Sequence, residues 1–218
     1  ICKSVWQGAE TFRNHPQNSA AEPTVQKGHL KMSEIEIKIN QLETLLDDLG
    51  LETLVLRRTS SVAWATCGAS TYVNSASTEG VLTLVIKRGE RHAFTTNIEA
   101  GRIMVEEGLG EQGWQMHPHD WWSSDDGIAG HLTGGVACDV TMEGAVDVSS
   151  AISRFRSILQ PVELDRFRAL GRICGDAMQA AILRVRPGMT EFEIASVLGE
   201  EAQARGVQPI VNLIASDE

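Results

Sequence analysis

Apolar residues recur at helical spacing in the segment that follows Met32. Separations of three and four positions place them on one face of a helix. The residues of this face are Ile35, Ile39, Leu42, Leu46 and Leu49. Ser33 and Glu36 match the capping box that begins many helices, and Gly50 stands where a left-handed C-terminal residue is favoured. The pattern predicts one amphipathic helix over residues 33–49.

Short apolar runs follow this helix. Residues 51–56 form a short run, and residues 81–86 form a stronger one, whose length and β-branched content favour a buried strand over a helix. A polar turn that contains glycine, residues 87–91, separates the second run from residues 92–95. This order predicts a hairpin, and we expect the sheet to be mixed.

Helical and strand patterns alternate in the segment after the hairpin. The expected elements are helices over residues 98–107 and 125–132 and strands over residues 114–117 and 136–140. Ser123 or Ser124 would cap the second of these helices. Such alternation is typical of an α/β domain, which we place from about residue 32 to about residue 157.

The pattern changes at Pro161. Apolar side chains then share one face of a single long helix, which the sequence Arg186-Pro-Gly188 ends. Thr190 and Glu193 match a second capping box, and the helix that they begin ends at Gly206. Residues 210–215 are typical of a strand. We interpret this region as an unfinished second domain, because two helices and one strand cannot close a core of their own.

Residues 1–31 have no sustained period of either kind. Glycines and prolines interrupt them, so we expect a poorly ordered leader. The helix signature begins directly after Met32, which we expect to be the natural start. The chain begins with Ile1 and stops just after a strand-like run, and we therefore expect it to be a piece of a longer protein.

Composition narrows the classes of partner and compartment. The chain has 218 residues, 42% of them hydrophobic, and a formal net charge of -10, which repels a polyphosphate backbone. No run approaches the ~20 apolar residues that cross a bilayer, and the N-terminus has no secretion signal. The four cysteines, which suit core thiols in a reducing compartment, are Cys2, Cys67, Cys138 and Cys174. We expect a cytoplasmic protein with no nucleic-acid or membrane partner.

One local cluster has the chemistry of metal ligands. The sequence His117-Pro-His119-Asp120 offers two imidazoles and a carboxylate, with His131 not far on, and such groups can hold zinc in a loop. The simpler interpretation is a polar connection between a strand and a helix, anchored by the two tryptophans that follow. A zinc site also needs a further fixed ligand and ordered surroundings. We therefore assign no metal ligand.

Other motifs have structural interpretations. The sequence Gly108-Leu-Gly-Glu-Gln-Gly113 matches the dinucleotide fingerprint in letters, but a helix precedes it and a strand follows, the reverse of what the fingerprint needs. We interpret it as a turn. Asp125 and Asp126 are interpreted as first-turn acids that complement a helix dipole. No serine lies in a G-x-S-x-G elbow, so the residues alone indicate no catalytic group.

Two stretches carry a family resemblance. Residues 60–68, Ser-Ser-Val-Ala-Trp-Ala-Thr-Cys-Gly, are similar to the type s-n-i-a-y-l-t-G, with Trp64 for tyrosine and Cys67 inserted before the glycine. Residues 163–168 match E-x-x-x-x-R, and residues 185–195, Val-Arg-Pro-Gly-Met-Thr-Glu-Phe-Glu-Ile-Ala, match i-r-P-G-m-T-E-x-e-l-a. With the order of elements, these stretches resemble the creatinase, prolidase and Xaa-Pro aminopeptidase family of pita-bread metallohydrolases.

The resemblance implies a fold. After a leader over residues 1–31 it gives an α/β N-terminal creatinase/prolidase-like domain, with a mixed, ribonuclease H-like sheet, over residues 32–160. Residues 161–218 would then be the first helices of an incomplete α+β pita-bread domain. The metal ligands and catalytic histidines of the family lie further along, so none is carried over, and Asp217 is not assigned.

The resemblance also implies a function. The parent would be a dinuclear-metal-dependent hydrolase that cleaves an amide C–N bond, with two divalent ions (Mn, Co or Zn), while this fragment itself binds none and has no catalytic residue. The alternative is a parent of the same fold that has lost its ligands and serves as an interaction module. Fold analogy by itself does not separate the two.

The resemblance implies a homodimer as well. The N-terminal domain of one subunit overhangs the active site of the other through the loop after residues 60–68. Here that loop, residues 69–78, is small and polar apart from Tyr72, the chain's only tyrosine. Our hypothesis is that Tyr72 contacts a small peptide or amide substrate across the dimer. The alternative is that Tyr72 folds back onto its own domain.

Overall fold

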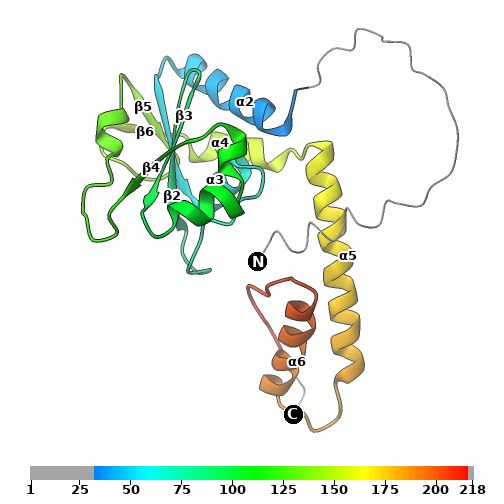
Figure 1. The fold of residues 1–218 in the computed structure, drawn as a ribbon. Coiled ribbons are helices and arrows are strands. Elements are labelled where there is room, and N and C mark those ends of the chain that lie inside the picture. The colour runs from blue at the N-terminus through cyan, green and yellow to red at the C-terminus, as the bar shows by residue number, and fades with distance from the viewer. Residues whose placement is uncertain (1–31, 216–218) are drawn as a thin grey trace, which may run out of the picture. The chain divides into compact units, whose positions relative to one another are not determined.

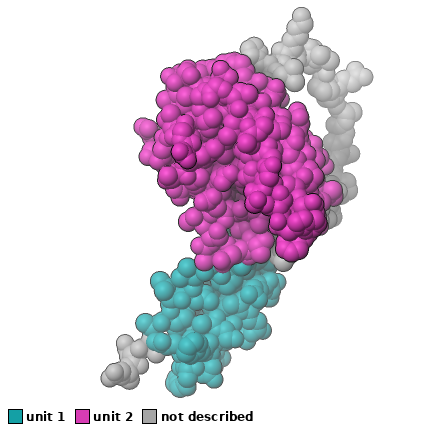
Figure 2. Space-filling model, turned by 90° about the vertical axis from the view of Figure 1, so that its left-hand side faces the viewer, with its two compact units in different colours: residues 1–27, 160–218 teal, residues 28–159 magenta. Residues whose placement is uncertain are grey.

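The computed structural model describes residues 32–215. Within this range the chain divides into two compact units between Leu159 and Gln160 (Figure 2). The first unit along the chain therefore comprises residues 32–159, drawn in magenta as unit 2 in Figure 2, and the second comprises residues 160–215, drawn in teal as unit 1. The expected leader, Cys2 and Asp217 lie outside the described residues.

A six-stranded mixed sheet forms the centre of the first unit (Figure 1). Its strands lie in the order β4-β3-β2-β1-β5-β6. They are β1 (Thr53–Arg58), β2 (Glu79–Lys87), β3 (Glu90–Thr96), β4 (Gln115–His119), β5 (Val136–Cys138) and β6 (Ala145–Asp147). β2 pairs antiparallel with β1 and β3, whereas the pairs β1–β5, β3–β4 and β5–β6 are parallel. The predicted α/β class, hairpin and mixed sheet are confirmed.

Helices and helical turns cover one face of this sheet. They are α2 (Glu34–Leu49), α3 (Thr59–Ala65), α4 (Ser149–Ser157), the π-helical turn η1 (Arg102–Glu106) and the 3-10 turn η2 (Leu109–Gln112). Alternate residues of β1 and β2, among them Leu54 and Leu84, face these helices because strand side chains alternate between faces. From α2, Leu42 and Leu46 join them in one core. Four residues of the predicted apolar face, Ile35, Ile39, Leu42 and Leu46, thus pack in this core, whereas Leu49 is exposed.

The opposite face of the sheet carries a smaller apolar cluster. Val55, Val85 and Phe94 occupy the alternate strand positions, and Ile128 packs on them. Ile128 belongs to a 3-10 turn, η3 (Ile128–His131), and Leu132, Val140 and Met142 come from the irregular chain around β5, whereas Val136, Cys138 and Ala145 belong to β5 and β6 themselves. Among the described residues, irregular chain rather than α-helix therefore covers this face.

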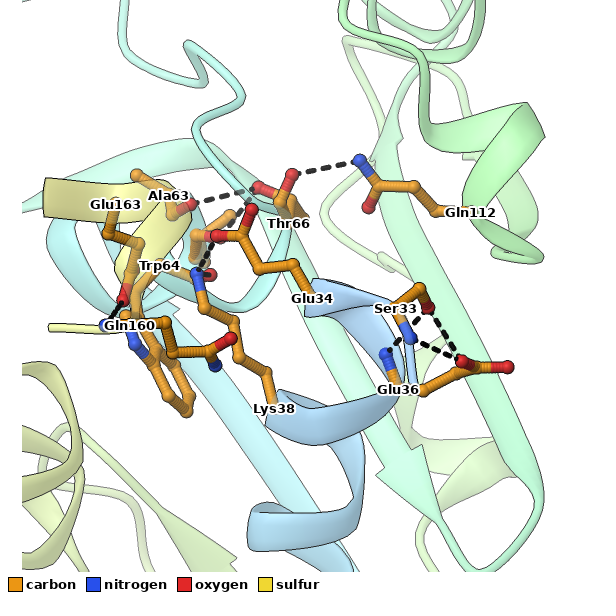
Figure 3. A network of polar contacts seen from close by, with 11 residues as sticks. Ser33, Glu34, Glu36, Lys38, Ala63, Trp64, Thr66, Gln112, Gln160 and Glu163 are labelled. Carbon is orange, nitrogen blue, oxygen red and sulfur yellow. Dashed lines mark hydrogen bonds and ion pairs between the residues drawn. The ribbon is translucent and has the colours of Figure 1, made fainter. Parts of the chain in front are cut away.

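A buried lysine ties α2 to the end of α3. The Lys38 ammonium donates to a Glu34 carboxylate oxygen at 2.7 Å and to the Trp64 carbonyl at 2.8 Å (Figure 3). It also lies 5.2 Å from the centre of a Trp64 ring. Because a buried charge is costly unless it is paired and hydrogen-bonded, these contacts fix the relative positions of the two helices. Trp64 in turn stacks on Phe155 of α4, with ring centres 6.2 Å apart.

Several elements of the first unit differ from the sequence prediction. The expected helix over residues 98–107 is wound as a π-helix from Arg102 to Glu106. The helix expected over residues 125–132 is only the turn η3, because Gly127, at φ 74°, leaves the helical region. α3, β6 and α4 were not predicted. α3 is seven residues long, too short to show a helical period.

The second unit consists of two helices, α5 (Pro161–Arg184) and α6 (Glu191–Ala204), which pack against each other. At the start of α5, the Gln160 N–H donates to the Glu163 carboxylate at 2.9 Å (Figure 3). The predicted capping box of α6 is present, since Thr190 N–H donates to the Glu193 carboxylate at 2.8 Å. The strand expected over residues 210–215 is absent. Residues 160–215 contain no other strand with which it could pair. No helix in the described range is long and apolar enough to cross a membrane.

Candidate functional site

The loop that carries Tyr72 leaves the end of α3 through a left-handed turn. Cys67 N–H donates to the Trp64 carbonyl at 3.1 Å, and Gly68 N–H donates to the Ala63 carbonyl at 2.7 Å. This pair of bonds places Cys67 at φ 60°, a conformation that favours glycine. The cysteine that interrupts the family-like stretch therefore occupies the position where glycine usually ends a helix.

An ion-pair network holds the start of the loop. Arg102 of η1 pairs with Glu99 at 2.8 Å and with Glu107 at 3.0 Å. Its guanidinium also donates to the Ser70 carbonyl at 2.9 Å, while Ser70 N–H donates to the Glu107 carboxylate at 2.9 Å. Both backbone groups of Ser70 are thus fixed by one charged network, which sets the direction in which the loop departs.

The two ends of the loop meet at a narrow neck. Val81 N–H donates to the Thr71 carbonyl at 2.8 Å, and a Cβ on Gly80 would lie 2.4 Å from the same oxygen, so this position requires glycine. At the tip, Ala76 N–H donates to the Asn74 side chain at 2.9 Å. The loop is therefore an internally hydrogen-bonded projection closed at its base.

Tyr72 lies at the neck of this loop and not at its tip. It is half-buried between the fully buried Thr71 and the exposed Val73. The residues from 73 to 79 are all exposed. A molecule that approached the loop would reach both these residues and the open part of the Tyr72 side chain.

The structure groups the candidate metal ligands differently from the sequence prediction. His117 and His131 lie together, but their third neighbour is His92 of β3 and not His119 or Asp120. One ligand atom from each of these three residues lies within 4.8 Å of the other two. Asp120 instead accepts a hydrogen bond from Asn97 at 3.0 Å. We call His92, His117 and His131 the histidine cluster.

Strand register explains how the histidine cluster forms. β3 and β4 are parallel, with His117 beside Phe94, so His92 and His117 lie diagonally on the same face. The His92 Nδ1 and His117 Nε2 atoms are 3.0 Å apart. His131 comes from the end of η3, and its ring centre lies 4.7 Å from that of His92 and 4.5 Å from that of His117. The parity of His92 and Phe94 in the predicted strand was the signal that could have placed His92 here.

The surroundings of His117 and His131 favour neutral imidazoles. Loss of hydration lowers the pKa of His117, and the nearby His131 and His92 lower it further. Loss of hydration also lowers the pKa of His131, again with a contribution from His92. His117 stacks on Phe94 with ring centres 4.7 Å apart, so an apolar ring forms one wall of the group.

The remaining sequence motifs have structural roles. Gly108 and Gly113 flank η2 at φ 75° and 77°, which confirms the turn interpretation of the glycine string. The interpretation of Asp125 and Asp126 as first-turn acids of an α-helix is wrong. Their carboxylates accept from the N–H groups two residues on, Gly127 and Ile128, at 2.9 and 3.1 Å, and shape the loop before η3.

The cysteines only partly match the expectation of core thiols. Cys138 is buried, and burial raises the pKa of its thiol. Cys67 is half-buried and Cys174 is exposed, so the expectation is wrong for Cys174. All three are free thiols.

Solved structures with a similar fold are Xaa-Pro peptidases. An Xaa-Pro dipeptidase from Bacillus anthracis has a TM-score of 0.58 at 14% identity, over 78% of this chain and 49% of its own. The prolidase from Pyrococcus horikoshii OT3 has a TM-score of 0.58 at 13% identity, over 77% of this chain and 48% of its own. An X-prolyl aminopeptidase from Caenorhabditis elegans, described as a cytosolic enzyme with a di-nuclear active site, has a TM-score of 0.55 at 14% identity. That match covers 78% of this chain and 31% of the enzyme.

Because the sequence identities are low, these matches show a shared fold and nothing more. The matched share of the chain is larger than residues 28–159 alone, so the likeness extends beyond the first unit. No family model matches the chain, and no curated protein matches it in sequence. The chain thus shares the fold of Xaa-Pro dipeptidases and prolidases, and it spans about half the length of the Bacillus anthracis and Pyrococcus horikoshii enzymes and about a third of the Caenorhabditis elegans enzyme.

Proposed function

We propose that this chain is the N-terminal portion of a dinuclear-metal-dependent hydrolase that resembles Xaa-Pro aminopeptidase and prolidase. The observation that carries the proposal is the shared fold, because the likeness covers more of the chain than the first unit with its six-stranded sheet. The P-G-M-T-E sequence in the connection between α5 and α6 adds to it. The proposed reaction is hydrolysis of an amide C–N bond. Residues 32–160 would be the N-terminal domain, with a ribonuclease H-like sheet, and residues 161–218 the start of the pita-bread domain.

The proposed metals are two divalent ions (Mn, Co or Zn) held by residues beyond this chain. A dinuclear hydrolytic site needs ligands that bridge and neutralise two ions, and carboxylates serve this purpose. The described residues offer one group with metal-ligand spacing, the histidine cluster, and it contains no carboxylate ligand. The residues present therefore do not fit a two-metal carboxylate site, and we assign this chain no hydrolytic step.

The contribution of this chain would be to substrate binding in a homodimer. The Tyr72 loop is held at its base by Arg102 and Glu107 and closed at its neck, and this fixed base supports a defined position for a substrate contact. We propose that Tyr72 contacts a small peptide or amide substrate from that position. The free cysteines suit the cytoplasm that the composition predicts, and the C. elegans enzyme is described as cytosolic.

The proposal is tested by assaying the longer protein and the 218-residue chain with an X-Pro peptide and Mn²⁺ or Co²⁺. We expect metal-stimulated release of the N-terminal residue by the longer protein and none by the 218-residue chain. A folded longer protein that lacks this activity and binds another protein instead would support the interaction module and overturn the hydrolase.

The role of Tyr72 has a separate test in the longer protein. Tyr72→Ala is expected to lower kcat/KM by about tenfold, because it removes binding energy that a neighbouring subunit supplies. Val146→Ala, at an exposed residue of β6 outside the loop, is the control and should leave kcat/KM unchanged. Unchanged kinetics for Tyr72→Ala in a protein that still dimerises would limit this residue to packing.

A further inference from the structure

The histidine cluster has the ligand chemistry of a metal site. Neutral imidazole is a common ligand for zinc and other borderline divalent ions. Three histidines with a fourth position left for water form one of the ligand sets found in protein zinc sites. His92 is buried at 5% exposure, while His117 and His131 are half-buried, so solvent reaches the group from one side. The cluster is therefore both anchored in the fold and open to an ion.

The hydrogen bonds around His92 define which ring nitrogen faces the cluster. His92 Nε2 lies 3.0 Å from a Glu90 carboxylate oxygen, and the same oxygen pairs with Lys87 at 3.0 Å. An ionised carboxylate only accepts, so Nε2 carries a proton, and the neutral tautomer that this bond selects has its lone pair on Nδ1. Nδ1 is the atom that faces His117. A carboxylate that orients a histidine through its second nitrogen is the usual support of a metal ligand.

The spacing needs only a small change to accept an ion. Two nitrogens bound to one tetrahedral zinc lie about 3.3 Å apart, because each Zn–N bond is about 2.0–2.1 Å long. The His92 Nδ1 and His117 Nε2 atoms are already 3.0 Å apart, and the third ligand atom is within 4.8 Å of both. Their mutual hydrogen bond would be given up, and the His117 proton would pass through solvent from Nε2 to Nδ1, so the ring stays neutral.

We propose that His92, His117 and His131 bind one Zn²⁺ ion, with one ring nitrogen from each residue and water in the remaining position. The ion would join β3, β4 and the turn η3, three segments that are separate in the sequence. It would thereby fasten the irregular cover to the face of the sheet that no α-helix covers among the described residues. The site uses residues of the first unit alone and does not rest on the proposed hydrolase function.

Calorimetric titration of Zn²⁺ into the chelator-treated 218-residue chain tests the proposal. We expect saturable binding of one ion per chain and a higher melting temperature in its presence. His131→Ala should weaken the affinity by ~100-fold or more, since it removes one of the three protein ligands. Glu90→Gln should weaken it by ~10-fold, as expected for a group that orients a ligand.

Two control variants exclude other histidines. His119→Ala removes a histidine of β4 that lies outside the cluster, and His15→Ala combined with His29→Ala removes the two in residues 1–31. Both should bind Zn²⁺ as the unchanged chain does. Bound Co²⁺ should show the visible absorption of a near-tetrahedral nitrogen site without the sulfur charge-transfer band that a cysteine ligand would add.

The proposal would be overturned by the absence of saturable Zn²⁺ binding, by binding that survives in His131→Ala, or by binding lost in the variant that lacks His15 and His29. A sulfur charge-transfer band with Co²⁺ would also overturn it, because the ligands would then include a thiolate. If His131→Ala does not fold, as judged by circular dichroism, His131→Gln replaces it, and retained affinity in that variant is equally contradictory.

Discussion

The two units of this chain use the same local chemistry to begin their helices and differ in what the helices bury. α2 and α6 both start with a complete capping box, Ser33 with Glu36 and Thr190 with Glu193. α2 then buries Leu42 completely, whereas Phe192 at the start of α6 is 90% exposed. Local sequence thus specifies a helix in both places, but only in the first unit does a sheet complete the core.

The second unit buries only small apolar side chains. Among the described residues from 160 onward, the buried apolar side chains are all alanines: Ala177, Ala181 and Ala202. Larger side chains of α5, such as Ile182 and Leu183, are more than 60% exposed. Arg184 adds ion pairs to Glu200 and Glu201, both at 2.6 Å, but exposed pairs contribute little free energy. Since helical stability comes mostly from packing, α5 and α6 should be the less stable part.

Leucine-to-alanine substitutions, one in each unit, should show the largest difference between the two units. Leu42→Ala should lower the free energy of unfolding by about 2–5 kcal/mol, because it leaves a cavity in the first unit. Leu183→Ala, the matched change at an exposed site, should alter it by less than about 0.5 kcal/mol. Urea denaturation followed by tryptophan fluorescence reports this difference, since residues 160–218 contain no tryptophan. Equal losses in the two variants would contradict the contrast.

Removal of the helix caps should sharpen the contrast. Ser33→Ala and Thr190→Ala each remove about 1 kcal/mol of helix stability. Because α2 is part of the closed core, Ser33→Ala should lower the urea midpoint seen by tryptophan fluorescence. Thr190→Ala should leave that midpoint unchanged and accelerate amide exchange within α6. A midpoint shift of similar size in both variants would mean that the units unfold together.

The smallest expected effect concerns a residue of the first unit that is strained by its own backbone. Cys67→Gly should raise the free energy of unfolding by about 0.5–1 kcal/mol. The left-handed conformation costs a residue with a side chain about 1–2 kcal/mol, and glycine avoids this cost. Part of the stabilisation is lost because glycine has more conformational freedom in the unfolded chain. Cys67→Ala keeps the Cβ and removes the thiol, so it controls for lost thiol contacts and should give no gain. Equal stability of the glycine and alanine variants would remove the argument from strain.

The sequence predicted features that depend on neighbouring residues. Capping residues and periodic apolar positions locate α2, α5 and α6, and the β-branched run over residues 81–86 locates β2. The sequence did not predict α3, which is short, or the left-handed Gly127 that interrupts the expected helix at residues 125–132. These depend on packing that no local period records.

The histidine cluster, like these elements, depends on packing between distant segments and could not be predicted from local sequence. The sequence offers His117 and His131 as candidates together with their near neighbours His119 and Asp120, and no local pattern in it pairs them with His92. His92 is 25 residues from His117 in the chain and reaches it through the parallel pairing of β3 with β4. Only the register of that pair, which follows from the whole sheet, brings the two rings onto one face.

Native-state amide hydrogen exchange on the 218-residue chain measures the contrast between the units residue by residue. The central amides of β2, at Leu84 and Val85, should exchange only through global unfolding of the first unit. Amides in the middle of α6, such as that of Leu198, should exchange at least ~100-fold faster through local opening. Protection of the α6 amides equal to that of β2 would contradict the account, because it would show that residues 160–215 share the closed, cooperative core of residues 32–159.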